Sequence, residues 1–183
     1  MLQLLEQLPP DARRCRFEAA LVADITPEAL ATLISRGPWQ LQSDPDGQPL
    51  ALVNGARRLG LHWGRFAPLL VGSRLVVAMA GTATEQAAGL GIPVLQLAGR
   101  GPQFTAGFAE AQRRLLGPGV VCAPGPVGAS ATLAASATLL LQLLNDPDLP
   151  ARCRAEGDRR LGPGGGSDRL ARAMLEALAA PSR

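Results

Sequence analysis

The chain contains no lysine and no tyrosine, and it has a single histidine, His62. Its basic residues are therefore all arginines, and they leave the 183-residue chain with a net charge of +3. Aromatic residues make up only 3% of the sequence, so the stacking platforms that single-stranded nucleic acids need are scarce. The composition argues against nucleic-acid binding. It suits a phosphorylated ligand or peripheral contact with an anionic lipid surface.

Other features that the sequence lacks narrow its location and chemistry. No apolar run reaches the roughly eighteen residues of a membrane span, and the first residues lack a basic head followed by a long apolar segment. We therefore expect a cytoplasmic protein. Cys15, Cys122 and Cys153 are far apart and form no CxxC pair, which predicts free thiols and no metal site. His62 lies in GLHWGRF without a nucleophile motif, so a loop or edge-strand residue is favoured over a catalytic base.

The remaining sequence predicts one α/β domain over 1–183, in which strands and helices alternate around a hairpin. We expect a Rossmann-like parallel sheet with helices on both faces. The predicted strands are 16–23, 39–42, 50–53, 75–79, 92–97 and 120–122. The predicted helices are 2–8, 26–35, 66–70, 104–116, 131–144 and 150–161, followed by a last helix that Ser167 or Asp168 caps. The glycines of GPGGGSDR lack the Gly-Lys-Ser/Thr of a phosphate loop.

The stretch LVVAMAGTATEQAAGLGIPVLQL, residues 75–97, is the most informative part of the chain. Two short apolar runs flank a Gly-Thr-rich turn and a short helix, which predicts one βαβ unit. Gly81 allows a sharp turn, and Thr82 or Thr84 can cap the helix through its hydroxyl. The amino terminus of such a helix presents unpaired N–H groups to an anion. The alternative is a well-capped structural unit that binds nothing.

The motif GTATEQ, followed by GLGIPV and then GPQFTAGFAEAQRRLLG, resembles the donor-binding half of lipid-A-disaccharide synthases. It is closer still to the lipid-A-disaccharide synthase-related proteins of cyanobacteria, and more distantly similar to the glycosyltransferase that adds N-acetylglucosamine to the peptidoglycan lipid intermediate. The resemblance implies the carboxyl-terminal domain of a GT-B glycosyltransferase, which binds a UDP-sugar. The first strand and the amino-terminal acceptor domain would then lie outside residues 1–183. The specific motifs occupy residues 80–117.

The resemblance also implies where a nucleotide sugar would lie. The segment against the donor diphosphate, where N–H groups and hydroxyls act as donors without a metal, is Gly81, Thr82, Ala83 and Thr84. The carboxylate that would hold the ribose falls on Gln86, a weaker partner for a hydroxyl, with Glu85 beside it. The residues facing the sugar hydroxyls and the uracil side are Gln103, Phe104 and Thr105. Phe104 could equally pack in the core at a helix start.

The implied reaction moves a sugar, N-acetylglucosamine or an acylated derivative, from UDP to a hydroxyl of a lipid-linked acceptor. No residue is a convincing base, so we name no catalytic residue, and we expect no cofactor. A second hypothesis is a noncatalytic nucleotide-sugar-binding module, or a fragment that needs a partner chain. A nicotinamide-dependent Rossmann enzyme is disfavoured because no G-x-G-x-x-G follows an early strand.

Overall fold

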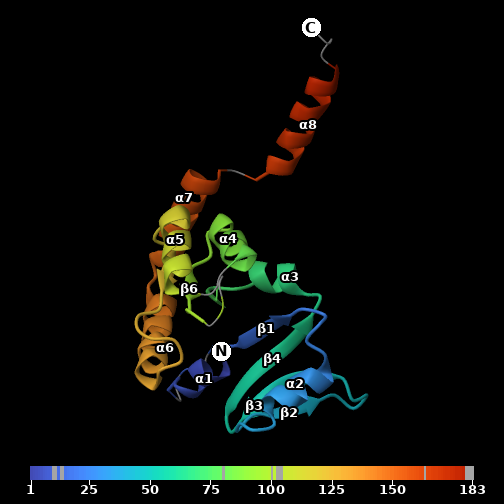
Figure 1. Cartoon of the computed structure of the whole chain (residues 1–183), viewed down its shortest axis with the longest axis vertical. Helices are drawn as coiled ribbons and strands as arrows, with labels where there is room; N and C mark the ends of the chain where they lie inside the picture. The colour runs from blue at the N-terminus through green and yellow to red at the C-terminus, as the bar shows by residue number, and fades with distance from the viewer. Residues whose placement is uncertain are drawn as a thin grey trace.

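The computed structural model of the chain describes residues 1–9, 12, 15–79, 81–99, 101, 105–162 and 164–179. It confirms an α/β chain in which helices and strands alternate, but the strands form two sheets and not one (Figure 1). The first sheet has four strands in the order β1-β4-β3-β2, and the second has three in the order β5-β6-β7. The expectation of a single parallel sheet is therefore wrong, since the hairpin that interrupts the alternation builds a sheet of its own.

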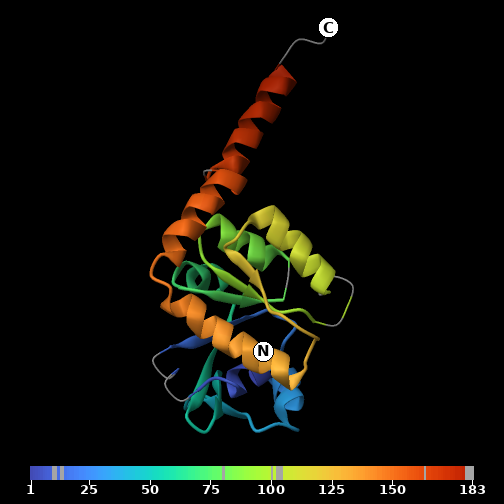
Figure 2. The same cartoon turned by 90° about the vertical axis from the view of Figure 1, so that its left-hand side faces the viewer.

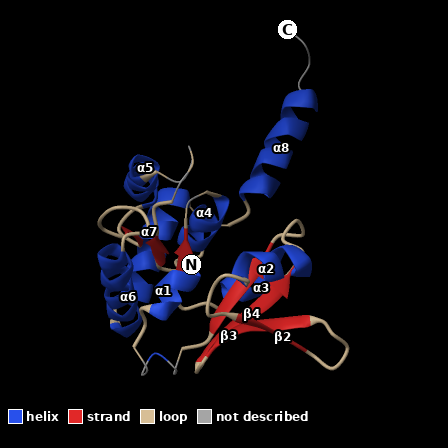
Figure 3. Cartoon of the chain, turned by 60° about the horizontal axis from the view of Figure 1, so that its bottom comes forward, coloured by secondary structure: helices blue, strands red, loops and turns tan. Residues whose placement is uncertain are grey.

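The first sheet is mixed, with β2, β3 and β4 side by side in Figure 3. Its strands are β1 (Phe17–Leu21), β2 (Gln40–Ser43), β3 (Pro49–Asn54) and β4 (Arg57–Trp63). β1 pairs in parallel with β4, whereas β3 pairs antiparallel with both β2 and β4. β4 lies between β1 and β3, so His62 belongs to an interior strand. The prediction of a loop or edge strand there is wrong.

The second sheet is wholly parallel, as the βαβ pattern predicts. Its strands are β5 (Val76–Ala78), β6 (Val94–Gln96) and β7 (Val120–Cys122). The crossover helices are α4 (Thr82–Gly89) between β5 and β6 and α5 (Ala106–Leu116) between β6 and β7. Val76, Val94 and Val120 stand in register and pack with residues of α4 and α5. The opposite face contributes Leu95 to the larger core together with α6 (Ser130–Asn145), so helices cover both faces.

The larger core joins the two sheets. It contains Leu4 of α1 (Leu2–Glu6), Leu52 of β3, Leu95 of β6 and Leu140 of α6, and each of these side chains is at most 1% exposed. α2 (Pro27–Ile34) contributes to the same core, and the Thr26 hydroxyl accepts from the Ala29 N–H as the predicted cap. In Figure 2, α6 (orange) crosses the face of the molecule that is turned toward the viewer. The second sheet is thus held against the first by shared apolar packing.

The remaining helices are α3 (Phe66–Val71), α7 (Leu149–Leu161) and α8 (Gly166–Ala179). α8 projects away from the rest of the chain in Figures 1 and 2, and none of its described side chains is buried. It begins at Gly166, so Ser167 and Asp168 lie inside its first turn and do not precede it as a cap. No helix among the described residues combines the length and the apolar character needed to cross a bilayer.

Candidate functional site

The candidate site lies at the carboxyl edge of the parallel sheet, where β5 leads into α4. β5 ends at Ala78 and α4 begins at Thr82, with Gly81 as its N-cap residue. Gly81 has φ +85°, and a Cβ built on it would meet nothing within 4 Å. Glycine is therefore needed here for the positive φ and not to relieve a steric contact. The turn and helix predicted from the sequence are present.

The Gln112 side chain on α5 holds this turn in place. Its Oε1 accepts hydrogen bonds from the Gly81 N–H at 3.2 Å and from Gln96 Nε2 at 2.7 Å. Its Nε2 donates to the Gly81 carbonyl at 3.4 Å and to Glu85 Oε1 at 3.2 Å. Gln112 is only 5% exposed and Gln96 is fully buried, so the hydrogen bond between these two amides is shielded from water. The Gln112 amide thus connects α5 to Gln96 of β6, to the backbone of Gly81 and to Glu85 in the first turn of α4.

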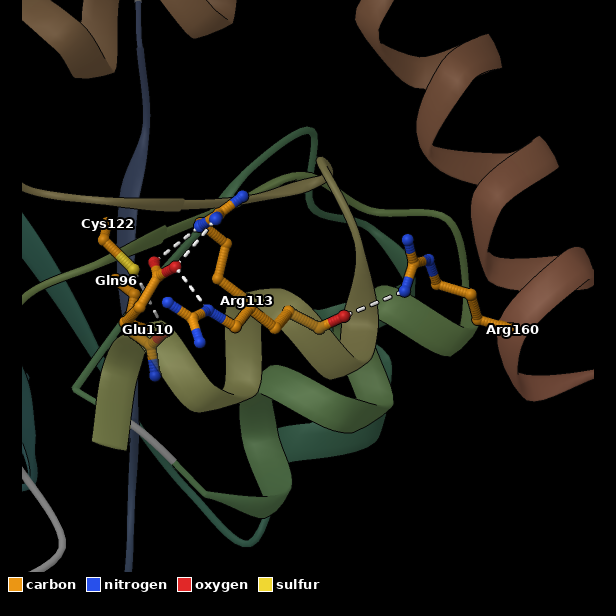
Figure 4. A network of polar contacts seen from close by, with 6 residues as sticks. Gln96, Glu110, Arg113, Cys122 and Arg160 are labelled. Atoms are coloured by element: carbon orange, nitrogen blue, oxygen red, sulfur yellow. Dashed lines mark hydrogen bonds and ion pairs between the residues drawn. The ribbon is translucent and has the colours of Figure 1, made fainter. Parts of the chain in front are cut away.

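Gln96 and Cys122 continue this network at the ends of the neighbouring strands. Gln96 is fully buried at the end of β6, and its Oε1 accepts from the Cys122 thiol at 3.9 Å. Burial raises the pKa of the Cys122 thiol, which keeps it protonated and able to donate. Figure 4 shows both residues beside Glu110 at one side of α5.

The two glutamines of the network, Gln96 and Gln112, were not among the predicted site residues. The sequence feature that could have identified them is a glutamine among apolar residues of a buried strand or a buried helix face. Gln96 follows Val94 and Leu95 in a buried strand, and Gln112 shares the buried face of α5 with Ala109 and Leu116. Such positions must find hydrogen-bond partners in the fold.

The start of α4 offers two backbone donors to a ligand. The Thr84 and Glu85 N–H groups donate to the Gly81 carbonyl, and the Gly81 N–H itself donates to Gln112. Within the described part of the chain, the N–H groups of Thr82 and Ala83 have no hydrogen-bond partner. These two N–H groups lie at the amino terminus of α4, which is the positive end of the helix dipole. Gly81 therefore shapes the turn, while Thr82 and Ala83 remain as donors.

Neither predicted capping hydroxyl caps α4, which is a correction to the sequence-based expectation. The Thr82 side chain is exposed, and the Thr84 side chain is fully buried. Thr84 Oγ1 has no hydrogen-bond partner among the described residues. The reason is that Thr84 lies in the third position of the helix, on its inward face, while glycine occupies the N-cap.

The other predicted residues divide between the network and the surface. Glu85 and Gln86 are both exposed, and Glu85 is the one that bonds to Gln112. Thr105 caps α5, because its hydroxyl oxygen accepts from the Phe108 N–H at 3.2 Å. Gln103 and Phe104 lie outside the described residues.

Two guanidinium groups of α5, those of Arg113 and Arg114, form ion pairs with Glu110. Arg113 donates to both carboxylate oxygens of Glu110, at 2.6 and 2.8 Å, and Arg114 donates to Glu110 at 3.0 Å. These hydrogen bonds lower the pKa of Glu110 from its ordinary value near 4.5 to about 2. With these two guanidinium groups paired, the described groups that could stabilise an anion at the start of α4 are its backbone N–H groups, together with the helix dipole.

The single histidine lies in a separate cluster on the first sheet. His62 Nε2 is 2.8 Å from Glu18 Oε2, and Arg16 donates to the other oxygen of the same carboxylate. A Cβ on Gly60 would collide with the Glu18 carboxylate, so glycine leaves the room that this pair requires. Burial opposes ionisation of Glu18, yet the hydrogen bonds from His62 and Arg16 lower its pKa overall. The pair is a cross-strand contact and does not belong to the site at α4.

Comparison of the chain with protein families, curated proteins and solved structures found no match.

Proposed function

We propose that this chain is the donor-binding half of a GT-B glycosyltransferase of the lipid-A-disaccharide synthase type, and that the carboxyl edge of β5-β6-β7 binds a UDP-sugar. The observation that carries this proposal is the start of α4. The N–H groups of Thr82 and Ala83, which have no hydrogen-bond partner among the described residues, follow a positive-φ glycine at the carboxyl end of a parallel strand. Ligands of α/β folds bind at such edges, and phosphates bind at such helix starts.

In this proposal the backbone supplies the electrostatic part of the chemistry. The N–H groups of Thr82 and Ala83 would donate to the diphosphate and share its charge as the sugar leaves UDP. Gln112 fixes the turn before the ligand arrives, so less ordering accompanies binding. Glu85, with Gln86 beside it, would accept from the ribose hydroxyls, while Thr105 and the segment before it would meet the sugar.

The acceptor in this proposal is a lipid-linked hydroxyl, bound by a domain outside residues 1–183 or by a partner chain. The chain would then work in the cytoplasm at the inner face of the membrane. The described residues at the start of α4 supply no free histidine or carboxylate as a base, since His62 pairs with Glu18 on the first sheet and Glu85 bonds to Gln112. The base would come from the acceptor side.

A second candidate is a noncatalytic nucleotide-sugar-binding module that works with a partner chain. The observation that favours it is the apolar surface of α8, where the side chains between 59% and 82% exposed are Leu170, Met174, Leu175 and Leu178. Apolar surface of this kind marks interaction sites. The candidates differ in turnover, so an assay of UDP release with a lipid-linked acceptor and the acceptor-binding chain present distinguishes them. Binding without release supports the module.

Calorimetric titration tests the proposal directly. We expect UDP-N-acetylglucosamine and UDP to bind with similar affinity, because the diphosphate makes the main contacts, and free N-acetylglucosamine to show no binding. Raising the salt concentration should weaken the binding of UDP. NADH serves as a control ligand for the nicotinamide alternative. Absence of UDP binding would contradict the proposal, and so would equal binding of the free sugar.

A further inference from the structure

A cavity of about 320 Å³ lies between α1, the start of β1 and the turn that joins β3 to β4. Its described lining includes the apolar side chains of Leu5, Leu8 and Phe17 and the charged side chains of Glu18, Arg57 and Arg58. It belongs to the first sheet, whereas the proposed nucleotide-sugar site belongs to the second. The volume is at the lower end of the range for small-molecule sites.

The floor of this cavity is apolar and continuous with the core. Leu5, Leu8 and Ala12 are between 5% and 8% exposed, and Leu5 and Leu8 belong to the core that joins the two sheets. Phe17, at the start of β1, packs against the same core. An apolar group of a ligand placed here would be removed from water against side chains that are already ordered.

The rim of the cavity carries charged side chains, and most of them already have hydrogen-bond or ion-pair partners within the chain. The Glu18 carboxylate accepts from Arg16 and lies against His62. Arg57 donates to the backbone carbonyls of Leu5, Glu6 and Leu8, at 3.0 to 3.2 Å, and so ties the end of α1 to β4. Its guanidinium keeps its positive charge while these donors are occupied.

Among the described lining residues, Arg58 is the cation that remains available. It is exposed, it lines the cavity, and its side chain makes no hydrogen bond or ion pair within the described part of the chain. Because Arg16 balances the charge of Glu18, the lining residues keep a positive excess from Arg57 and Arg58. The guanidinium of Arg58 can form a bidentate contact with a carboxylate or a phosphate.

We infer that this cavity binds a small amphipathic anion, with its apolar part on the Leu5, Leu8 and Phe17 floor and its anionic group on Arg58. Its recognition requires both parts of the ligand. The apolar part supplies burial, and the charged head is held by Arg58 in the field of Arg57. The head can be a carboxylate or a phosphate, and both carry the charge and the oxygen pair that a guanidinium recognises.

Calorimetry with four probes tests this inference on the whole chain. Decanoate and decyl phosphate carry the two head groups, decanol carries the same chain without charge, and inorganic phosphate carries the charge without a chain. We expect one or both anionic amphiphiles to bind with one-to-one stoichiometry and the two partial probes to bind at least about tenfold more weakly. The tighter of the two anions identifies the head group.

Charge variants locate the binding. Arg58→Glu should weaken binding of the preferred amphiphile at least about tenfold, because it replaces a charge-assisted contact by repulsion. Arg58→Lys should weaken binding less than Arg58→Glu does, because lysine keeps the positive charge but loses the bidentate contact. Arg65→Glu makes the same charge change at an exposed arginine that does not line the cavity and should leave affinity unchanged. Urea unfolding should show all three variants folded, because neither arginine side chain has a hydrogen-bond or ion-pair partner among the described residues.

Three outcomes would overturn the inference. They are binding of neither anionic amphiphile, binding of decanol as tight as that of the anions, and an affinity that Arg58→Glu and Arg65→Glu change equally. None of the probes contains a nucleotide, so these results are independent of the proposed donor site.

Discussion

Two buried polar side chains near the start of α4 differ in how well their hydrogen-bonding groups are satisfied. The Gln112 amide makes four hydrogen bonds, whereas Thr84 Oγ1 makes none with a described residue. A buried hydroxyl without a partner costs about 1 to 3 kcal/mol. Thr84 therefore lowers stability at the turn that Gln112 stabilises.

Thr84→Val tests this balance. Valine keeps the shape of threonine and removes the unsatisfied hydroxyl, so we expect the free energy of unfolding to rise by about 1 kcal/mol. Urea unfolding followed by circular dichroism measures it. Thr138→Val is the matched control, because Thr138 is exposed and its hydroxyl already donates to the Ala134 carbonyl; this change should bring no gain. A lower stability of Thr84→Val would show that its hydroxyl has a partner in solution.

At the scale of elements, α7 packs closely on the crossover helices. A Cβ on Gly157 of α7 would lie 2.5 Å from the Ala88 carbonyl oxygen of α4. Arg160, one turn further along α7, donates to the backbone carbonyls of Arg114 and Leu115 at the end of α5. Figure 4 shows the Arg160 side chain reaching from α7 toward α5. α7 therefore fixes α4 and α5 relative to each other, and with them the turn at Gly81.

Gly157→Ala should reveal this close approach. Alanine in a helix interior ordinarily stabilises by about 1 kcal/mol relative to glycine, but here the added methyl group would press on backbone. We expect a net loss of stability in thermal or urea unfolding. Gly107→Ala provides the comparison, because its Cβ would lie 3.9 Å from Thr105 Oγ1 and the position is exposed; we expect this variant to gain stability. A gain in both variants would refute close packing at Gly157.

The sequence predicted local elements better than their assembly. Short apolar runs identify β5, β6 and β7, and Thr26 marks the start of α2. β4 was missed because Arg57, Arg58 and Gly60 interrupt its apolar residues, and only partner strands on both sides make it a strand. The division into two sheets depends on the same nonlocal pairing.

The candidate site shows the same limit. The turn at Gly81 is a local property of GTATEQ and could be predicted. Its support by Gln112 could not, because the two residues are 31 positions apart and meet only after α5 packs beside β6. Thr84 does not cap α4 because its side chain lies on the inward face of the helix. Which face turns inward also depends on packing.

At the scale of the molecule, one core joins the two sheets. Leu4, Leu95 and Leu140 belong to α1, the second sheet and α6, and all three are at most 1% exposed. Both tryptophans lie on the side of the first sheet, where Trp39 donates to Glu6 at 2.7 Å and Trp63 to the Ile25 carbonyl at 2.8 Å. The two halves should therefore unfold together.

Leu140→Ala tests the shared core. We expect a loss of about 2 to 5 kcal/mol, as for other buried leucines. Tryptophan fluorescence reports on the first sheet, and far-ultraviolet circular dichroism is dominated by the helices. The two probes should give midpoints that agree with each other, both in the unaltered chain and in Leu140→Ala. A midpoint that shifts in circular dichroism alone would mean that the sheets unfold independently.

The most direct test of the central claim adds a negative charge at the start of α4. Thr82→Asp places a carboxylate where the helix dipole stabilises it, so the fold should be retained while the diphosphate is repelled. Calorimetry with UDP should show at least about tenfold weaker binding for Thr82→Asp. Thr32→Asp makes the same change at an exposed position on α2 and should bind UDP as the unaltered chain does. Equal affinity of the two variants would contradict a nucleotide-sugar site at the start of α4.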